Sequence, residues 1–592
     1  MNAMGQERAA AVVLFDGDCG FCRLWVERWR AATGPAVAYE PYQSAAARFP
    51  QISRDECAKA VHLVEPDGRV RRGADAVFAA LSRAGGLQRA WSSLYEASPP
   101  FRRLSEAAYA FVASRRILFS RLTRLLWGLP APPPVDGTRR ALLAGLGLCY
   151  LLAFASLGVQ IRGLIGAHGL LPAADLLSSA GVRLGVWRFY LIPSLAWLNS
   201  SDAALVGLCA AGAAASLGLA ADFWAGPCAL ACWAAYLSLC AVGGDFLSYQ
   251  WDALLLEAGL IAVFLAPWSR RARAPAPRLP LLLMRLLLAK LVFESALVKI
   301  LSGDPAWRDL TALNYHWWTQ PLPTPAAWYA ARLPALLQKA ACAGMFAVEF
   351  GAPVLLLMPR RPRMLGAALI AALMTAIALT GNYGFFNLLT AVLCLSALDD
   401  GVRPLPRLAP AASATPAAPP PRAASRARAA FAALWLWSSL AGAGPLAPLR
   451  SFNSYGLFAV MTRTRDEISL EVSVDGRDWR EWPFRWKPGD PRRAPPWIAP
   501  HMPRLDWQMW FASLGAPSPW LAGLFARVLQ GEPAVLGLLG PSPLGAVRPR
   551  YARAVLWRTR FSTPAERRED GAWWTREPAG LFAPPVRLRG RD

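Results

Sequence analysis

The chain has 592 residues, of which 55% are apolar and 17% charged, and its formal net charge is +24. Soluble domains contain about 45–50% apolar and about 25% charged residues, so this composition excludes a typical soluble enzyme and an acidic disordered protein. A nucleic-acid-binding protein would gather its basic residues in one patch or tail. The arginines here are spread over the whole chain, and no nucleic-acid partner is expected. The composition is typical of a membrane protein that carries soluble parts.

The first 125 residues are predicted to form a soluble module of mixed α and β character. A short apolar strand ends at Phe15, and the motif Phe15-Asp16-Gly17-Asp18-Cys19-Gly20-Phe21-Cys22 leads from it into a helical pattern. The apolar runs and the Pro-Asp-Gly turn between them predict a hairpin over 61–70, with helices beginning near Ala74 and Leu104.

A Cys-x-x-Cys pair at the junction of a strand and a helix suits thiol-disulfide exchange. Cys19 would stand at the helix N-terminus, where the helix dipole favours a thiolate, and Cys22 could resolve a mixed disulfide. The supporting carboxylates of Asp16 and Asp18 disfavour a thiolate, so the pair need not be strongly oxidising.

Two other interpretations of the cysteine pair stay open. The thiols could be structural, or Cys57 and His62 could complete a zinc site with them, although the spacing is loose for a zinc module. The chain has only four histidines, which are scattered, and it contains no Walker or dinucleotide-binding glycine motif. We therefore expect neither a metal nor a cofactor.

The module resembles the DCC-type thiol-disulfide oxidoreductase family, which is named after the Asp-Cys-x-x-Cys core found here at 18–22. The segment 73–76, and Tyr109 with Arg115, fit the later part of the family pattern. The resemblance implies a thioredoxin-like fold in which the first cysteine attacks and the second resolves. It also implies a thiol redox partner.

Apolar runs dominate the chain from 141 to 445, and most are close to the ~20 residues that a helix needs to cross a bilayer. We predict about nine spans, of which 251–267 is weaker because it carries two carboxylates and 384–399 is weaker because it is short. The aromatic segment 185–198 suits the membrane interface better than a span. The seven stronger spans are 141–161, 202–221, 227–243, 281–301, 336–358, 365–381 and 428–445.

Several ionisable residues lie within or beside these spans. Charges at bilayer depth are costly and usually face a partner or a cavity. Lys290 and Glu294 are four residues apart, so they share a helix face and could neutralise each other. We interpret the cluster mainly as helix–helix contacts. Its members are Asp252, Glu257, Lys290, Glu294 and Lys299.

The distribution of arginine predicts the topology. If the N-terminus is cytoplasmic, the inner loops hold 12 arginines and 2 acidic residues, and the outer loops hold 5 arginines and 4 acidic residues. This excess agrees with the positive-inside rule. It places residues 1–140 in the cytoplasm and the chain after about 446 on the opposite side of the membrane.

The C-terminal part is polar and rich in tryptophan. Alternating apolar residues over 468–474, followed by Asp475-Gly476, predict a β-hairpin. We expect a β-rich, sandwich-like domain with a helix around 519–530, and it holds no disulfide because the last cysteine is Cys394. The predicted division of the chain is a thioredoxin-like domain (1–125), a linker (126–140), a membrane domain (141–445) and an extracytoplasmic domain (446–592).

Most of the chain, from about 141 to 577, resembles the lipase maturation factor family. The segments that carry the resemblance are 246–252, 302–325, 381–387, 452–458 and 500–510. Members of that family are multi-span proteins of the endoplasmic reticulum that help secreted lipases to fold and dimerise, and their C-terminal domain faces the lumen. The fused N-terminal module departs from the animal pattern and, with the GC-type composition, indicates a bacterial protein of the cytoplasmic membrane; in a eukaryote the expected location is the endoplasmic reticulum membrane.

These observations predict a membrane-bound maturation factor for exported or membrane client proteins, lipase-type by resemblance, with a fused cytoplasmic thiol-disulfide module. The first alternative is a membrane redox enzyme without a chaperone role, which would pass reducing equivalents to thiols such as Cys228 and Cys232. The second is a transporter or lipid-modifying enzyme that uses the membrane charges. Candidates for client recognition are Trp307, Arg308, Asn314, Tyr315, His316, Gln320, His501, Arg504, Asp506 and Trp507.

Overall fold

Two units of the chain fold around separate cores in the computed structural model. The structure describes residues 11–129, 131–270, 275–408, 422–516 and 518–588. The first unit comprises Met1–Pro134 with Pro359–Pro362, and the second comprises Val135–Met358 with Arg363–Asp592.

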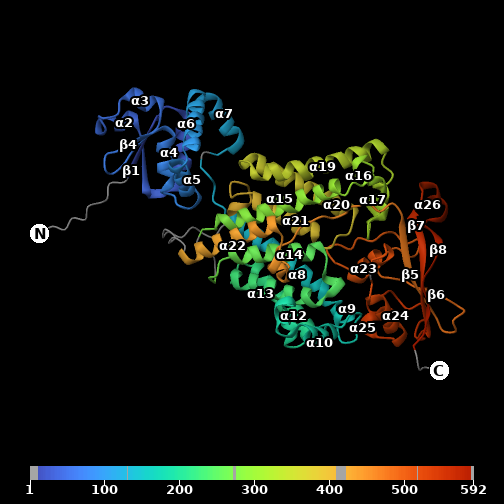
Figure 1. The fold of residues 1–592 in the computed structure, drawn as a ribbon. Helices are drawn as coiled ribbons and strands as arrows, with labels where there is room; N and C mark the ends of the chain where they lie inside the picture. Colours follow the sequence, from blue (N-terminus) through green and yellow to red (C-terminus); the bar gives the residue numbers. More distant parts are fainter. Residues whose placement is uncertain (1–10, 130, 271–274, 409–421, 517, 589–592) are drawn as a thin grey trace. The chain divides into compact units, whose positions relative to one another are not determined.

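The first unit is an α/β domain built on a four-stranded sheet of order β2-β1-β3-β4 (Figure 1). Strand β1 (Ala11–Phe15) pairs in parallel with β2 (Val37–Pro41) and antiparallel with β3 (His62–Val64). Strand β4 (Val70–Arg72) pairs antiparallel with β3, which confirms the hairpin predicted over 61–70.

Seven α-helices accompany this sheet among the described residues of the first unit. The expected helices near 74 and 104 are present, but the second starts earlier, because Ser98 accepts a hydrogen bond from the Phe101 N–H and Pro99 occupies the first turn. The helices are α1 (Gly20–Thr33), α2 (Tyr42–Ala45), α3 (Arg54–Lys59), α4 (Gly73–Ser82), α5 (Gly86–Ala97), α6 (Pro99–Ser114) and α7 (Arg116–Trp127).

In the described part of the second unit, a helix overlaps each of the nine segments predicted to be spans. Four of these helices fall short of a span in length, hydropathy or freedom from charge: α14 (Gln250–Leu265), α15 (Arg278–Leu301), α21 (Phe386–Cys394) and α22 (Arg422–Ala441). The number of spans therefore stays a prediction. The five that are long and apolar enough to cross a membrane are α8 (Asp136–Gly158), α12 (Asp202–Ala220), α13 (Ala225–Val242), α19 (Ala335–Leu357) and α20 (Arg360–Thr380).

Segments predicted to lie on the inner side meet at one end of the helix bundle. The Asp400 carboxylate accepts the backbone N–H groups of Gly137 and Thr138, at 3.0 and 2.9 Å, and so caps the first turn of α8. The Asp136 carboxylate accepts the Ala276 N–H at 2.8 Å. Because of the cap from Asp400, α8 begins within the stretch 126–140 that the sequence predicts to be a linker.

The described C-terminal residues contain one antiparallel sheet of order β6-β5-β7-β8 rather than the predicted sandwich. Its second layer is helical, because α23 (Arg504–Ser513) and α24 (Trp520–Gln530) pack against β5 and β7. The hairpin at Asp475-Gly476 and the helix near 519–530 are confirmed. The strands are β5 (Arg465–Ser473), β6 (Arg480–Trp482), β7 (Tyr551–Phe561) and β8 (Trp574–Val586).

Short helices fill the connections of the second unit. Within the aromatic segment 185–198 the chain forms short turns whose apolar side chains are largely exposed. The remaining α-helices are α9 (Ile161–Ile165), α10 (Ala173–Leu184), α11 (Arg188–Leu191), α16 (Pro305–Arg308), α17 (Leu313–Thr319), α18 (Pro325–Ala330), α25 (Pro533–Leu536) and α26 (Pro564–Asp570).

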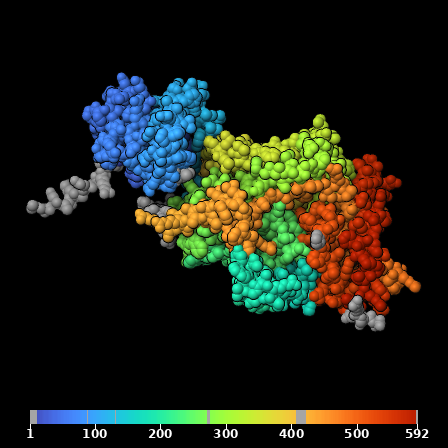
Figure 2. All heavy atoms as spheres, viewed as in Figure 1, coloured from blue at the N-terminus to red at the C-terminus, as the bar shows by residue number. Residues whose placement is uncertain are grey.

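One continuous apolar core joins the helix bundle to the C-terminal sheet. It runs from Leu142 in α8, through the buried tryptophans Trp251 and Trp507, to Ala554 in β7. The C-terminal residues, red in Figure 2, accordingly lie directly against other parts of the same unit. The sheet domain is therefore packed as part of the bundle and not carried on a free tether.

Candidate functional site

The Cys-x-x-Cys pair lies where β1 turns into α1. Cys19 is the N-cap residue of the helix, and its Sγ accepts the Cys22 backbone N–H at 3.4 Å. Burial, and the hydrogen bond and charge of Cys19, raise the pKa of the Cys22 thiol to about 12. At neutral pH Cys22 is therefore protonated, while Cys19 is partly exposed at the helix end. This asymmetry suits one attacking and one resolving thiol.

The loop before the cysteines is held by Gln43 in α2. The Gln43 side-chain amide donates to Asp16 at 2.8 Å and to Asp18 at 3.2 Å, and its carbonyl oxygen accepts the Gly17 N–H at 3.0 Å. Sequence reasoning found both aspartates but missed Gln43, because nothing local marks a glutamine that lies 25 or more residues away. Through these bonds to Asp16 and Asp18, Gln43 holds the loop that leads from β1 into α1.

Arg116, at the start of α7, is a second residue that sequence reasoning missed. Its guanidinium lies 3.7 Å from the Asp16 carboxylate and donates to the Lys59 carbonyl oxygen at 2.6 Å. Its positive charge lowers the pKa of Cys22 and so opposes the effect of burial.

Cys57 and His62 do not join the cysteine pair. Cys57 is buried in a separate cluster with Leu14 and Ile52, and burial lowers the pKa of His62. Among the described residues, no three His, Cys, Asp or Glu side chains are grouped in a way that could hold a metal ion. The structure therefore does not support the zinc interpretation.

A buried ion pair joins the C-terminal domain to the helix bundle. Both terminal nitrogens of Arg504 in α23 donate to the Asp252 carboxylate in α14, at 2.9 and 2.8 Å. The Tyr236 hydroxyl donates to the same carboxylate, and the Phe246 carbonyl oxygen accepts from Arg504. Arg504 and Asp252 are 1% and 2% exposed, so their charges are removed from solvent.

The residues just before Arg504 are bonded to the last turn of α8 and to Gln160, the residue that precedes α9. Ser156 Oγ accepts the Met502 N–H at 2.9 Å and lies 3.0 Å from His501 Nδ1. Gln160 accepts the Arg504 N–H at 3.0 Å and donates to the Met502 carbonyl oxygen at 2.9 Å. The chain from 501 to 504 is thus bonded to the bundle through both backbone and side chains.

A second buried network is centred on Glu257, which is fully buried in α14. Its carboxylate accepts from Lys290 Nζ at 2.6 Å, from the Trp435 indole at 2.9 Å and from the Tyr455 hydroxyl at 2.7 Å. The backbone and side-chain amides of Asn453 add two further bonds of 3.1 Å each. The carboxylate therefore connects three helices to the segment 452–458.

The partner predicted for Lys290 is wrong. Lys290 pairs with Glu257 on the neighbouring helix, and Glu294 instead accepts the Tyr455 N–H at 2.7 Å. The interhelical partner is available because Glu257 faces α15 at the same depth, which spacing along one helix does not reveal. Lys299, the last member of the cluster, donates to both oxygens of Glu349 in α19 at 2.8 Å.

The aromatic loop 302–335 is fastened at two points. Asn382 donates to the carbonyl oxygens of Leu322 and Pro323 and accepts the Ile498 N–H at 2.8 Å. The buried guanidinium of Arg465 in β5 donates to the Trp318, Gln320 and Pro321 carbonyl oxygens. The loop is therefore bonded to the C-terminal domain on one side and to the end of α20 on the other.

The candidates for client recognition fall into three groups by exposure. Arg308 and Asn314 are exposed, and the side chains of Tyr315, His316 and His501 are half-buried. The other five are buried; four of them are hydrogen-bonded within the chain and Trp507 packs against the rings of Tyr249 and Trp251, so their observed role is to hold the loop and α23 in place. They are Trp307, Gln320, Arg504, Asp506 and Trp507.

Three family models match the chain. Residues 13–122 match the DCC1-like thiol-disulfide oxidoreductases, 137–404 match the lipase maturation factor transmembrane domain, and 451–584 match the lipase maturation factor C-terminal domain. Human lipase maturation factor 2 (Homo sapiens) is 34% identical over 76% of this chain and 82% of its own length.

The chain belongs to the lipase maturation factor family. Lipase maturation factor 2 of Gallus gallus is also 34% identical, and lipase maturation factor 1 of Bos taurus is 31% identical over 76% of this chain and 89% of its own length. No solved structure matches. With its apolar helices, this lipase maturation factor homologue is a multi-pass membrane protein, and an N-terminal domain of DCC1-like type is fused to it.

The segments that resemble lipase maturation factors are those that fasten the second unit together. Segment 246–252 meets 500–510 through the Arg504–Asp252 pair, and 452–458 meets α14 through Glu257. The residues that form these contacts, such as Asn453 and Tyr455, could be singled out in the sequence only as members of the family-like motif, because no local pattern marks them.

The raised pKa of Cys22 predicts selective alkylation. A thiol reacts as its thiolate, and with a pKa of about 12 only roughly one Cys22 in ten thousand is ionised at pH 8. We expect iodoacetamide to label Cys19 first in the folded protein, and labelling of Cys22 to accelerate about tenfold per pH unit as the pH rises from 7 to 10. Peptide mass spectrometry measures both rates. Equal labelling of the two cysteines at pH 8 would contradict the asymmetry.

The Arg504–Asp252 pair predicts a large loss of stability when one partner is removed. Arg504→Met leaves the Asp252 carboxylate buried without its cation, and breaking such a pair costs about 3–5 kcal/mol. Thermal unfolding in detergent should show a lower midpoint for this variant. Arg504→Met combined with Asp252→Leu should recover part of the loss, because no unpaired charge then remains. A midpoint for Arg504→Met equal to that of the exposed control Arg477→Ala would exclude this role.

Proposed function

We propose that this protein is a membrane-bound maturation factor for exported proteins, with lipase-type clients. The observation that carries the proposal is that both lipase maturation factor domains are present, and that their characteristic segments form one bonded scaffold around the loop 302–335. The name of the relatives supports lipases as the client class. A scaffold fixed in this way presents the exposed part of the loop to a client at little entropic cost.

We further propose that the loop and the C-terminal domain face the extracytoplasmic side, with the N-terminal module in the cytoplasm and the four-part division of the chain as predicted. The grouping of contacts supports this topology. Segments predicted to be outer, such as 244–250, 302–335 and 382–384, contact the C-terminal domain, whereas Asp136, Ala276 and Asp400 meet at the other end of the bundle. The arginine-rich composition and the fused module support a bacterial cytoplasmic membrane as the location.

The client proposal predicts a specific loss of secreted activity. Deleting the gene in its native host should lower the activity of a secreted lipase-type enzyme without lowering its transcript. The variant Arg308→Ala/Asn314→Ala should restore no more than about half of that activity, because exposed contact residues each contribute on the order of 1 kcal/mol to binding. Arg477→Ala, which removes an exposed arginine at the β5–β6 turn, is the matched control. Unchanged activity across all secreted lipases would contradict the proposal.

The N-terminal module is proposed to exchange disulfides with a thiol redox partner. Cys19 attacks and Cys22 resolves, as the burial of Cys22 beside an N-cap thiol supports. The alternative is a membrane redox enzyme without a maturation role, in which membrane thiols receive the electrons. One observation favours keeping this alternative: Cys228 is partly exposed, although Cys232 is buried.

Trapping distinguishes these roles. The Cys22→Ser variant cannot resolve its mixed disulfide, so it should accumulate a covalent adduct at Cys19, detectable by non-reducing electrophoresis and mass spectrometry. An adduct with another protein supports a redox role toward a partner, and an internal Cys19–Cys228 bond supports the membrane redox enzyme. Cys19→Ser/Cys22→Ser is the control and should trap nothing. If Cys22→Ser also traps nothing, the module has no exchange role.

A further inference from the structure

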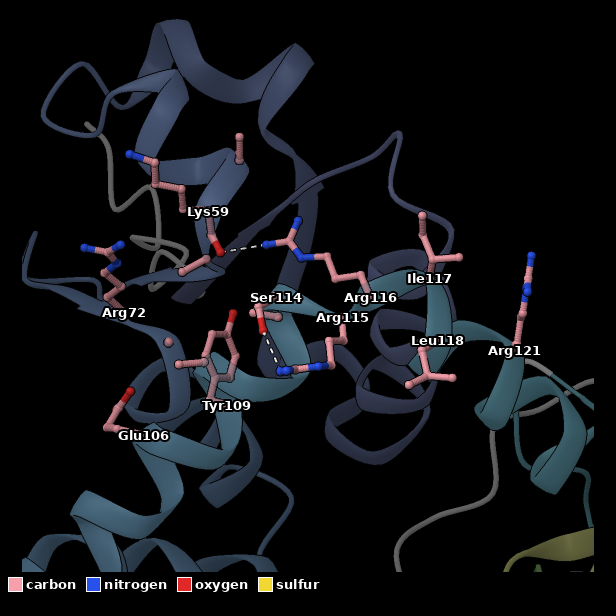
Figure 3. A pocket seen from close by; sticks show the side chains of 15 residues that line it. Lys59, Arg72, Glu106, Tyr109, Ser114, Arg115, Arg116, Ile117, Leu118 and Arg121 are labelled. Atoms are coloured by element: carbon pink, nitrogen blue, oxygen red, sulfur yellow. Dashed lines mark hydrogen bonds between the residues drawn. The ribbon is translucent and has the colours of Figure 1, made fainter.

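A basic cavity opens in the first unit, lined by residues of α3, β4, α6 and α7 (Figure 3). Its volume is about 1230 Å³, larger than the ~300–1,000 Å³ of a typical small-molecule site. Five of its lining residues are cationic and one is acidic. The cations are Lys59, Arg72, Arg115, Arg116 and Arg121, and the acid is Glu106.

These cations line the cavity from separate elements. Figure 3 shows Lys59 and Arg72 on one side of the cavity and Arg116 and Arg121 on the other, with Tyr109 between them. Lys59 ends α3 and Arg72 ends β4, whereas Arg116 and Arg121 belong to α7. The fold thus places four charges from three different elements around one cavity.

The positive charge of the cavity is not neutralised from within. Lys59, Arg72 and Arg121 are exposed and form no ion pair with any carboxylate in the part of the chain that the structure describes. Glu106 is already engaged, since it accepts from the Tyr95 hydroxyl at 2.6 Å and from the Asp75 N–H at 3.1 Å. The cations are therefore available to an anion that enters the cavity.

A smaller cavity, which shares lining residues with the basic cavity, reaches the thiol of Cys22. It has a volume of about 370 Å³ and is lined by Cys22, Asp16 and the aromatic rings of Trp25 and Trp29. Its remaining wall includes Tyr109 and Arg116, which also line the basic cavity. A molecule held by an anionic end in the basic cavity can therefore extend its other end along Tyr109 toward Cys22, whose backbone nitrogen lies 3.4 Å from Cys19 Sγ.

We propose that the small-molecule substrate of the module is an anionic thiol or its disulfide, with carboxylate or phosphate groups bound by Lys59, Arg72 and Arg121. The planar, multidentate donors of arginine match both kinds of anion. Tyr109 and the tryptophans contact the uncharged part that carries the sulfur. This inference rests on the proposed redox function of the module and adds the class of molecule that it exchanges with.

The exchange is balanced without any further reagent. The Cys19 thiolate attacks one sulfur of the anionic disulfide, so that a bond from Cys19 to that sulfur forms and the other half leaves as a thiolate that takes up a proton. Cys22 then loses its proton to solvent and attacks Cys19, and the second half leaves as a thiol. The substrate gains two electrons and is reduced to two thiols, and the dithiol becomes the Cys19–Cys22 disulfide. The reverse steps reduce the protein.

The test compares disulfides that differ in charge, using the reduced full-length protein in detergent at low ionic strength. Glutathione disulfide supplies carboxylates, coenzyme A disulfide supplies phosphates, 2-hydroxyethyl disulfide is neutral and cystamine is cationic. Alkylation at timed intervals, followed by mass spectrometry of the Cys19–Cys22 peptide, gives each rate. We expect at least one anionic disulfide to react about tenfold faster than cystamine, and the difference to shrink in high salt. Whichever anion reacts faster identifies the bound group.

The cavity variant assigns this preference to its residues. Arg72→Ala/Arg121→Ala should slow the preferred anionic disulfide about tenfold and leave the reaction with 2-hydroxyethyl disulfide unchanged. Arg69→Ala, which removes an exposed arginine in the β3–β4 turn outside the cavity, is the matched control and should change neither rate.

Three results would overturn the inference. Equal rates for anionic, neutral and cationic disulfides would show that charge does not select the substrate. If the cavity variant keeps its anionic rates but loses binding to vesicles that contain phosphatidylglycerol, the cations serve a lipid surface instead. If no disulfide oxidises the dithiol at all, the inference fails, and the proposed redox function fails with it only if the Cys22→Ser variant also traps no adduct; in the first two cases only the inference fails.

Discussion

The bidentate contact between Arg504 and Asp252 is the interaction on which the arrangement of the larger unit depends. Two charges that are removed from water lose several kcal/mol of solvation each, and only a close, well-oriented pair with further hydrogen bonds offsets that loss. A slip of α23 by one residue would leave both charges without partners. The pair therefore contributes less to net stability than to the choice of one docking position among many apolar ones.

The same principle explains the other buried polar groups of the unit. Apolar helices in a bilayer gain little by associating with each other, because lipid tails are as apolar as their own side chains. Glu257, Asn382 and Arg465 supply the directional bonds that apolar packing lacks, and each has several partners from distant segments. Asn382 and several partners of Glu257 and Arg465 lie in the segments that resemble lipase maturation factors, so the resemblance reports how the scaffold is assembled as much as what it contacts.

Features that depend on neighbouring residues could be predicted from the sequence. The hydropathy of each run located the helices, alternation located the hairpin at Asp475-Gly476, and the motif at 15–22 located the dithiol. Features that depend on distant residues could not. The partner of Lys290 lies on another helix, Asp400 caps a helix that starts more than 250 residues earlier, and Gln43 fixes the loop before Cys19 from a different element. Alternation likewise shows that one face of β5 is buried but not that helices, rather than a second sheet, cover it.

The continuous core shared by the bundle and the C-terminal sheet has a consequence for biogenesis. The strands and α23 are synthesised after the last helix of the bundle. Their apolar faces nevertheless pack in one core with residues of α8 and α14, two helices that are synthesised earlier. The C-terminal segment consequently has no finished native surface to fold on until the earlier helices have been inserted and assembled. The assembled bundle thus acts as a template for the last domain. If translation stops before that domain, apolar surface of the bundle stays exposed, and quality-control proteases can recognise it.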